Sequence, residues 1–231
     1  MSLISVQSLK YSWPDSAKNT LDISVFEVAP GEQVFLKGPS GCGKSTFLSA
    51  LSGVIDVPAG SIRIAGQDIA SLGPSGRDRF RVDHMGIIFQ VFNLLPWLSA
   101  IDNVILPCRF SKRRLRQTKG DPRSAALRLL GELGLRDQAI LEAPAMSLSV
   151  GQQQRVAAAR ALIGGPDVVL ADEPTSALDE EARNAFVSLL QSECRAAGAA
   201  LVFVSHDQRL ETQFDRLVEF RDMNHAGAVQ C

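Results

Sequence analysis

A short glycine-rich segment contains the first side chains that could act on a ligand. It reads Gly38, Pro39, Ser40, Gly41, Cys42, Gly43, Lys44 and Ser45, with Thr46 directly after it. Glycines let backbone N–H groups turn inward around phosphate oxygens. At this spacing the lysine places its charge near the β- and γ-phosphates, and the following serine offers a hydroxyl to Mg²⁺. A helix expected after the loop points its positive end at the same anion. The segment predicts a site for a nucleoside triphosphate such as ATP, and for Mg²⁺. A chance glycine-rich turn is the weaker alternative.

Cys42 lies inside this phosphate loop and has two interpretations. It is either a tolerated small residue or a reactive thiol, since it stands at the start of a helix and close to Lys44. The second interpretation predicts that a thiol reagent inactivates the protein and that bound ATP protects it.

Two carboxylates follow an apolar run later in the chain. Residues 168–171 are Val, Val, Leu and Ala, and Asp172 and Glu173 come next. In nucleotide-binding α/β proteins, ligands gather at the carboxyl ends of the strands. We therefore expect Asp172 to hold Mg²⁺ through water and Glu173 to polarise the attacking water. The alternative is a surface acidic turn, which is weaker beside a complete phosphate loop.

A second apolar run ends in a histidine. Residues 201–204 precede Ser205, His206 and Asp207. If this run is the next buried strand, His206 should face the same pocket, where it could bond the γ-phosphate. His84 and His225 have no such context, and we assign them no role.

These residues need strands and helices to position them. The runs at 168–171 and 201–204 are apolar throughout, which is typical of parallel strands buried on both faces. A helix expected over 179–197 joins them into a βαβ unit. Alternation at 61–65 predicts an exposed-edge strand. Further strands are expected over 3–9, 21–28, 33–37 and 85–89, and a helix over 44–51.

The middle of the chain is expected to be helical. Asp121 is a suitable N-cap and Pro122 suits the first helical position. An apolar face follows at helical spacing, made of Ala126, Leu129, Leu130 and Leu133. We expect one domain over 1–231, with an α/β core and a small β lobe at about 1–89 and 165–231 and a helical subdomain at about 90–164.

The composition limits the class of protein. The chain has 231 residues and a formal net charge of −1, which gives it no overall electrostatic reason to coat nucleic acid. Its four scattered cysteines indicate free thiols in a reducing, cytoplasmic compartment. No signal peptide is recognisable, and no apolar run approaches the roughly 20 residues of a membrane-spanning helix. We expect another chain to hold this one at any membrane where it works.

One further motif distinguishes this chain from other phosphate-loop proteins. Residues 148–155 read Leu, Ser, Val, Gly, Gln, Gln, Gln, Arg, and an alanine-rich helix follows. This sequence resembles the signature of ATP-binding cassette (ABC) ATPases. Gln90 stands at the family's Q-loop glutamine, residues 172–175 resemble its Walker B extension, and residues 176–179, ending in Asp179, resemble its D-loop. His206 matches the switch histidine. Trp13 resembles the aromatic residue that stacks on adenine, with Tyr11 as a competitor.

The resemblance implies a P-loop NTPase (RecA-like) core with a mainly parallel sheet, an antiparallel β subdomain and an inserted helical subdomain. It also implies a homodimer with two ATP molecules between the copies. Ser149, Gly151 and Gln152 of one copy would cap the nucleotide of the other, and Gln90 would contact Mg²⁺. Val150 replaces the usual glycine of the signature, so the backbone there must be ordinary.

Residues 90–96, 102–104 and 170–175 resemble one bacterial group, the ATPases of lipoprotein release, macrolide efflux and a cell-division complex. The resemblance implies an ATPase on the inner face of the cell membrane, bound to a permease whose substrate this chain does not encode. An apolar cluster is expected to be either lobe core or a permease groove: Phe92, Leu94, Leu95, Trp97 and Leu98. The basic run 112–116 is expected to be a solvated face or a lipid contact.

Two other functions compete with a transporter ATPase. A soluble ABC ATPase that remodels a macromolecule would need a second cassette or a basic cleft, and the sequence shows neither. A small-molecule kinase would not need the signature or His206.

Overall fold

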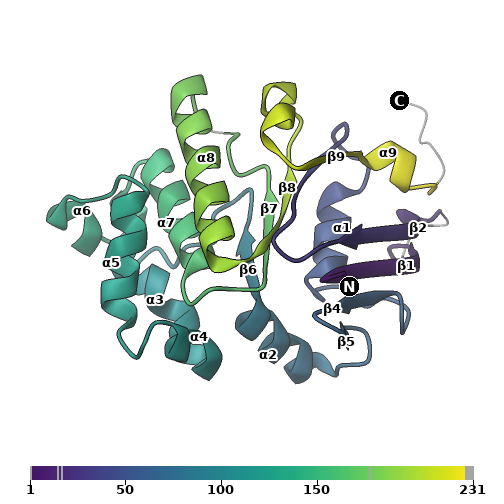
Figure 1. The fold of residues 1–231 in the computed structure, drawn as a ribbon, viewed down its shortest axis with the longest axis horizontal. Helices are drawn as coiled ribbons and strands as arrows, with labels where there is room; N and C mark the ends of the chain where they lie inside the picture. Colours follow the sequence, from purple (N-terminus) through teal and green to yellow (C-terminus); the bar gives the residue numbers. More distant parts are fainter. Residues whose placement is uncertain (1, 15, 17, 177, 227–231) are drawn as a thin grey trace.

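The computed structural model describes residues 2–14, 16, 18–176 and 178–226. Ala177 of the expected D-loop and Cys231 lie outside the described residues. Figure 1 shows two sheets, with most helices gathered on one side of the larger sheet.

The larger sheet is parallel and carries the strands that end in chemically interesting residues. Its order is β6 (Met85–Ile88), β7 (Val168–Asp172), β8 (Ala200–Val204), β3 (Gln33–Lys37) and β9 (Arg216–Glu219). Alternate residues of a strand enter different cores: Val169 and Ala171 pack on one face, and Val168 and Leu170 on the other. This explains the unbroken apolar runs, because both faces of the sheet are covered.

The smaller sheet is antiparallel. Its order is β2 (Leu21–Val28), β1 (Ile4–Tyr11), β4 (Ile62–Ile64) and β5 (Gln67–Asp68). The prediction of an exposed-edge strand at 61–65 was wrong, because β4 pairs with β1 on one side and β5 on the other. The alternation is real, but it places Ile62 and Ile64 in the core.

Helices cover the two faces of the parallel sheet unequally. One core contains α1 (Lys44–Leu51) and the antiparallel sheet, while the other contains α3 (Ala100–Phe110), α5 (Pro122–Glu132), α7 (Val150–Leu162) and α8 (Glu180–Ala197). The remaining helices are α2 (Pro74–His84), α4 (Lys112–Gln117), α6 (Gln138–Glu142) and α9 (Phe220–Met223), with 3₁₀ turns at Ala145–Ser147 and Gln208–Gln213. The predicted α/β fold, with a parallel sheet, an antiparallel sheet and helices, is confirmed.

The predicted starts of two helices are confirmed by side chains that cap the backbone. Asp121 accepts from the backbone N–H of Ser124, with Pro122 at the first helical position. Asp179 caps α8 in the same way, through the N–H of Ala182. These caps satisfy N–H groups that a helix start leaves without partners.

The prediction that the basic run 112–116 forms a solvated face was wrong for part of it. Arg114 is 1% exposed, and its guanidinium bonds backbone carbonyls of other elements. Arg113 is half-buried and pairs with Asp167 at 2.7 Å. Lys112 and Arg116 are exposed, as expected of a solvated face.

Candidate functional site

The parallel register brings four chain segments to one edge of the large sheet. Ile88 of β6 pairs with Ala171 of β7, and Asp172 pairs with Val204 of β8, which in turn pairs with Leu36 of β3. The residues that follow these strand ends therefore meet there: Gln90, Asp172, Glu173, His206 and the phosphate loop. This is the edge where parallel α/β sheets bind ligands.

The phosphate loop joins β3 to α1 with a backbone that requires glycine. Gly43 has φ of 105°, and its Cβ would approach the carbonyl oxygen of Thr20 at 3.2 Å. No side chain caps the start of α1, so its first N–H groups face the loop. Lys44 is 7% exposed, and its Nζ donates to the carbonyls of Gly38 and Pro39, each at 2.7 Å. The loop thus combines backbone donors with a buried cation, which suits a polyphosphate.

Cys42 lies beside that lysine. Its Sγ is 3.9 Å from Nζ of Lys44, and the thiol is half-buried rather than enclosed. Of the other cysteines that the structure describes, Cys108 and Cys194 are buried. Burial raises the pKa of Cys194 to about 12 and raises that of Cys108, so neither is expected to react readily.

Asp172 is a half-buried carboxylate of the site. Burial raises its pKa, a hydrogen bond from Ser45 and the charge of Lys44 lower it, and the neighbouring Glu173 raises it further. The Ser45 hydroxyl and the Asp172 carboxylate come from separate elements, α1 and β7, and meet at the carboxyl edge of the sheet. Oxygen ligands of this kind suit Mg²⁺.

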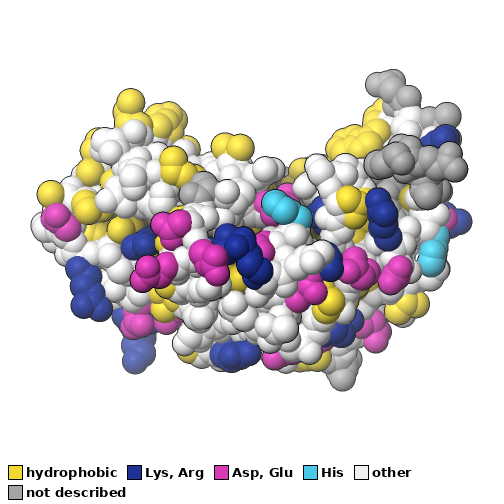
Figure 2. Space-filling view, turned by 90° about the horizontal axis from the view of Figure 1, so that it is seen from above, with side chains coloured by type: hydrophobic (Ala, Val, Ile, Leu, Met, Phe, Trp, Pro, Cys, Tyr) yellow, Lys and Arg dark blue, Asp and Glu magenta, His cyan; other side chains and the backbone are white. Residues whose placement is uncertain are grey.

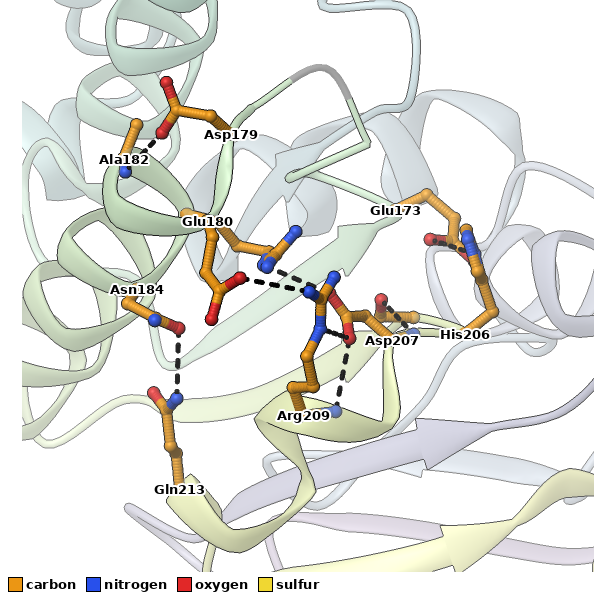
Figure 3. Close-up of polar contacts among 11 residues, drawn as sticks. Glu173, Asp179, Glu180, Ala182, Asn184, His206, Asp207, Arg209 and Gln213 are labelled. Atoms are coloured by element: carbon orange, nitrogen blue, oxygen red, sulfur yellow. Dashed lines mark hydrogen bonds and ion pairs between the residues drawn. The ribbon is translucent and has the colours of Figure 1, made fainter.

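Glu173 and His206 point toward each other at the ends of β7 and β8 (Figure 3). His206 Nδ1 lies 2.9 Å and 3.0 Å from the two carboxylate oxygens of Glu173. The Glu173 side chain is 15% exposed, and that of His206 is 71% exposed. Glu173 has φ of 46°, an unusual value for a residue with a side chain. Its N–H donates to the carbonyl of Val204, which holds it there.

Ion pairs that the sequence did not reveal hold the histidine segment in place (Figure 3). Asp207 pairs with Arg183 of α8 and with Arg209, at 3.0 Å and 2.9 Å. The bond from Arg209 lowers the pKa of Asp207. Sequence reasoning missed Arg183 because a charged residue on a helix is usually solvated. Its partner Asp207 is 24 residues further along the chain, so no local spacing signals the pair.

The remaining predicted contacts lie at the margins of the site. Gln90 is exposed, two residues after β6. The Trp13 ring is 46% exposed and meets Tyr11 edge to face, with ring centroids 5.3 Å apart. Tyr11 packs against the core of the antiparallel sheet. Of these two residues, Trp13 is the more exposed.

The signature motif begins α7. Ser149 and Gln152 form a reciprocal cap: the Ser149 hydroxyl accepts from the N–H of Gln152 at 3.3 Å, and the Gln152 amide accepts from the N–H of Ser149 at 2.8 Å. Val150 is the first residue of the helix, so the expectation of an ordinary backbone there is confirmed. A Cβ on Gly151 would meet Leu178 at 3.6 Å.

The structure does not bring the signature and the phosphate loop together within one chain. Helix α1 packs in the core on one face of the parallel sheet, and α7 packs in the core on the other face (Figure 1). Among the described residues, no hydrogen bond or ion pair joins Ser149, Gly151 or Gln152 to the loop 38–45.

Comparison with known proteins identifies the family. The sequence profile described as "ABC transporter" matches residues 21–176, which is more than half of the chain. This chain belongs to the ABC transporter family. The resemblance read from the signature is therefore confirmed.

Curated relatives of the cassette share about two fifths of its residues. It is 40% identical over 216 residues to the macrolide export ATP-binding/permease protein MacB of Sodalis glossinidius, which covers 93% of this chain and 32% of that protein. For the protein of the same name in Chromobacterium violaceum, the identity is 43% over 196 residues, 84% of this chain and 29% of that protein. The cassette spans about a third of the length of these relatives.

Solved structures agree with this assignment. The cassette superimposes on the ATP-binding cassette MJ0796, described as a dimer in a post-hydrolysis state bound to ADP and Pi, with a TM-score of 0.81 and 31% identity. The match covers 94% of this chain and 93% of that one. A second dimeric structure of MJ0796 gives a TM-score of 0.80. The cassette is an ATP-binding domain and an ATPase.

A groove of about 580 Å³ lies between the parallel sheet and the helical elements of the cassette. Its apolar lining includes Ile87, Phe89, Pro107 and Phe110, and arginines 79, 81, 114 and 160 border it. The predicted cluster 92–98 contributes little to it, since Leu94 packs in the core and Trp97 is 69% exposed elsewhere. In Figure 2, charges of both signs are interspersed across the visible face, with hydrophobic side chains toward the helical end.

None of the helices in the described part of the chain is long and apolar enough to cross a membrane.

Proposed function

We propose that two copies of the cassette bind two ATP molecules between them and, by closing and reopening, drive a membrane permease. One observation carries the dimer: the helices that begin at the phosphate loop and at the signature, α1 and α7, pack on opposite faces of the parallel sheet. One chain thus cannot close its own site, whereas two chains related by a two-fold axis can each complete the other's. The described dimers of MJ0796 support this arrangement.

Within each site, the roles follow from the geometry. Lys44 and the start of α1 hold the phosphates, with the N–H groups of Gly38 and of residues 40–43 supplying backbone donors. Trp13 stacks on the base. Ser45, Asp172 and Gln90 are the residues that would hold Mg²⁺, which supplies charge neutralisation on the phosphate oxygens when bound. Their oxygens fit that ion.

Glu173 orients and polarises the attacking water, and His206 bonds the γ-phosphate. The bond between the two side chains keeps both at the strand ends, beside the predicted phosphate position. Across the interface, Ser149, Gly151 and Gln152 cap the nucleotide, aided by the positive end of α7. Asp179 follows β7 at the same edge and contacts the second copy. In other enzymes, removing one hydrogen-bond donor that is fixed in place for the transition state, as the capping groups of Ser149 and Gly151 would be, lowers the turnover rate by a factor on the order of 10²–10³.

The partner is a permease, and the cassette works on the cytoplasmic side of the membrane. The relatives combine ATP-binding and permease parts under one name, which describes macrolide export. We place this cassette with a permease of that kind, in export, extraction or mechanotransmission. The groove beside α3 is the docking site, because it joins the sheet that holds ATP to the helices that hold the signature.

Introducing a charged side chain into the groove tests whether the permease docks there. Phe110 is 63% exposed and lines the groove. Phe110→Glu should leave the ATPase activity of the isolated cassette within about twofold and lower its capture by the co-expressed permease about tenfold or more. The matched control is Val25→Glu on β2, which is 62% exposed and lies away from the groove. If the permease captured both variants equally, the assignment of the groove as the docking site would be wrong.

A further inference from the structure

Arg114 of helix α4 is a buried cation that joins elements from distant parts of the sequence. It is 1% exposed. Its Nε donates to the carbonyl of Val82 at 2.7 Å, and its Nη2 donates to that of Met85. Its Nη1 donates to the carbonyls of Ile163 at 2.7 Å and Ala161 at 3.2 Å. One guanidinium therefore bonds four backbone carbonyls.

These carbonyls belong to two separate parts of the molecule. Val82 and Met85 lie at the end of α2 and the start of β6, the strand that leads to Gln90. Ala161 and Ile163 lie at the end of α7, the helix that begins at the signature. The last carbonyls of a helix lack partners and carry partial negative charge, so a cation is well placed there. Arg114 fastens the end of the signature helix to the parallel sheet.

The charge of Arg114 is used to bind backbone carbonyls rather than a carboxylate, which supports a role in holding elements in position. Among the described residues, no carboxylate lies within ion-pair distance of Arg114. The nearby acids are engaged by other groups: Asp167 pairs with Arg113 and His84, and Asp83 accepts from Ser111. Burial lowers the pKa of Arg114 to about 10, which leaves it charged at neutral pH. Such a buried charge is tolerated only when its donors are bonded.

The joint around Arg114 is tightly packed at the level of the backbone. A Cβ on Gly86 of β6 would lie 2.3 Å from the carbonyl oxygen of Ala161. A Cβ on Gly164 would lie 2.8 Å from the carbonyl oxygen of Arg114. The end of α7 is thus held against β6 and α4 with no room to slide.

We propose that Arg114 is a positioning residue for ATP hydrolysis in the dimer: it fixes one end of α7 and thereby sets where Ser149 and Gly151, at the other end, meet the nucleotide of the second copy. This rests on the proposed function. A helix the length of α7 spans about 20 Å. A tilt of about 3° at its fixed end then moves the signature by about 1 Å. A misplacement of that size can cost about 10²-fold in rate.

Two variants of Arg114 test the proposal, with Arg116→Met as the matched control. Arg116 lies on the same helix and is exposed. Arg114→Lys keeps the charge but cannot reach all four carbonyls, and Arg114→Met removes every bond. Binding of a fluorescent ATP analogue should stay within about twofold, because none of the four carbonyls that Arg114 bonds belongs to the phosphate loop. Turnover should fall about tenfold in Arg114→Lys and further in Arg114→Met, a loss in kcat rather than in nucleotide affinity.

Dimer formation is the second measurement. In a Glu173→Gln background with Mg-ATP, Arg114→Lys should need about tenfold more protein to dimerise than Arg116→Met does. Turnover and dimerisation equal to the control would overturn the proposal. A fall in nucleotide affinity that parallels a fall in melting temperature would also overturn the proposal, because it would indicate only a structural role for Arg114. Arg114→Lys carries the test if Arg114→Met does not fold. A Glu173→Gln parent that never dimerises would instead refute the proposed function.

Discussion

Glu173 occupies a backbone conformation that its side chain makes costly. Its φ of 46° lies in the left-handed region, where a non-glycine residue is strained by about 1–3 kcal/mol. The turn directs the carboxylate toward His206 at the edge of the sheet. The conformation is held by the bond from its N–H to Val204. A strained residue so close to the phosphate loop fits a role in placing the attacking water.

The ionised carboxylate of Asp172 is expected to lower the stability of the folded, nucleotide-free protein. The folded chain holds its proton more tightly than the unfolded chain, because burial raises its pKa. Ionising it therefore costs stability as the pH rises from the unfolded to the folded pKa, and the full cost remains at neutral pH. Asp172→Asn should raise the melting temperature of nucleotide-free protein by about 2–4 °C at pH 7. Thermal melts at several pH values check this.

The gain should shrink as the pH is lowered, since both states then carry the proton. The same variant should lose Mg-ATPase activity. A lower melting temperature for Asp172→Asn at pH 7 would contradict the account of a carboxylate whose burial opposes its charge.

At the residue scale, sequence reasoning found the groups whose types and spacing define a chemistry, but not those that support them. Lys44, Asp172, Glu173 and His206 stand beside glycines or at strand ends, which are visible in a sequence. Arg114 is one of several consecutive basic residues, and nothing in such a run shows which member turns inward. Its partners are backbone carbonyls, which have no sequence signal.

At the element scale, the backbones of β6 and α7 approach each other closely at Gly86 and Ala161. Gly86 is the residue that permits this approach, because a Cβ there would overlap the carbonyl group of Ala161. Backbone atoms cannot move aside as a flexible side chain can. Gly86→Ala should therefore lower the free energy of unfolding by about 2–3 kcal/mol. Urea unfolding, with an unchanged slope and a lower midpoint, measures the loss.

Gly131→Ala provides the comparison for that experiment. Gly131 lies within α5 and has open space where a Cβ would be. Alanine there should stabilise the fold by up to about 1 kcal/mol through its helix propensity. If Gly86→Ala proved as stable as Gly131→Ala, the close approach of β6 and α7 would be wrong.

Elements with one strong period or an unbroken apolar run could be predicted from the sequence, and others could not. Strands β7 and β8 are apolar because both faces are covered. Helix α2 was not predicted, because none of its residues is buried and its polar composition shows no apolar face. The place of β4 inside the small sheet was misread, since alternation shows one buried face but not the number of neighbouring strands.

At the scale of the whole molecule, the two halves of a catalytic site face different directions. Helices α1 and α7, which begin at the phosphate loop and at the signature, pack on opposite faces of the parallel sheet, and the sequence predicted both motifs but not the face on which each helix packs. In the proposed mechanism, a second copy completes each site. ATP bound between the copies would stabilise that dimer by mass action, and hydrolysis would remove the stabilisation.

The molar mass of Glu173→Gln in solution tests this account most directly. The substitution should slow hydrolysis by about 10²–10⁴-fold while leaving ATP binding intact, so ATP stays between the copies. Sedimentation of the variant with saturating Mg-ATP should show a dimer, whereas the same protein with ADP, or with Lys44→Ala added, should remain monomeric. A monomer at saturating Mg-ATP, with nucleotide shown to be bound, would contradict the two-site mechanism.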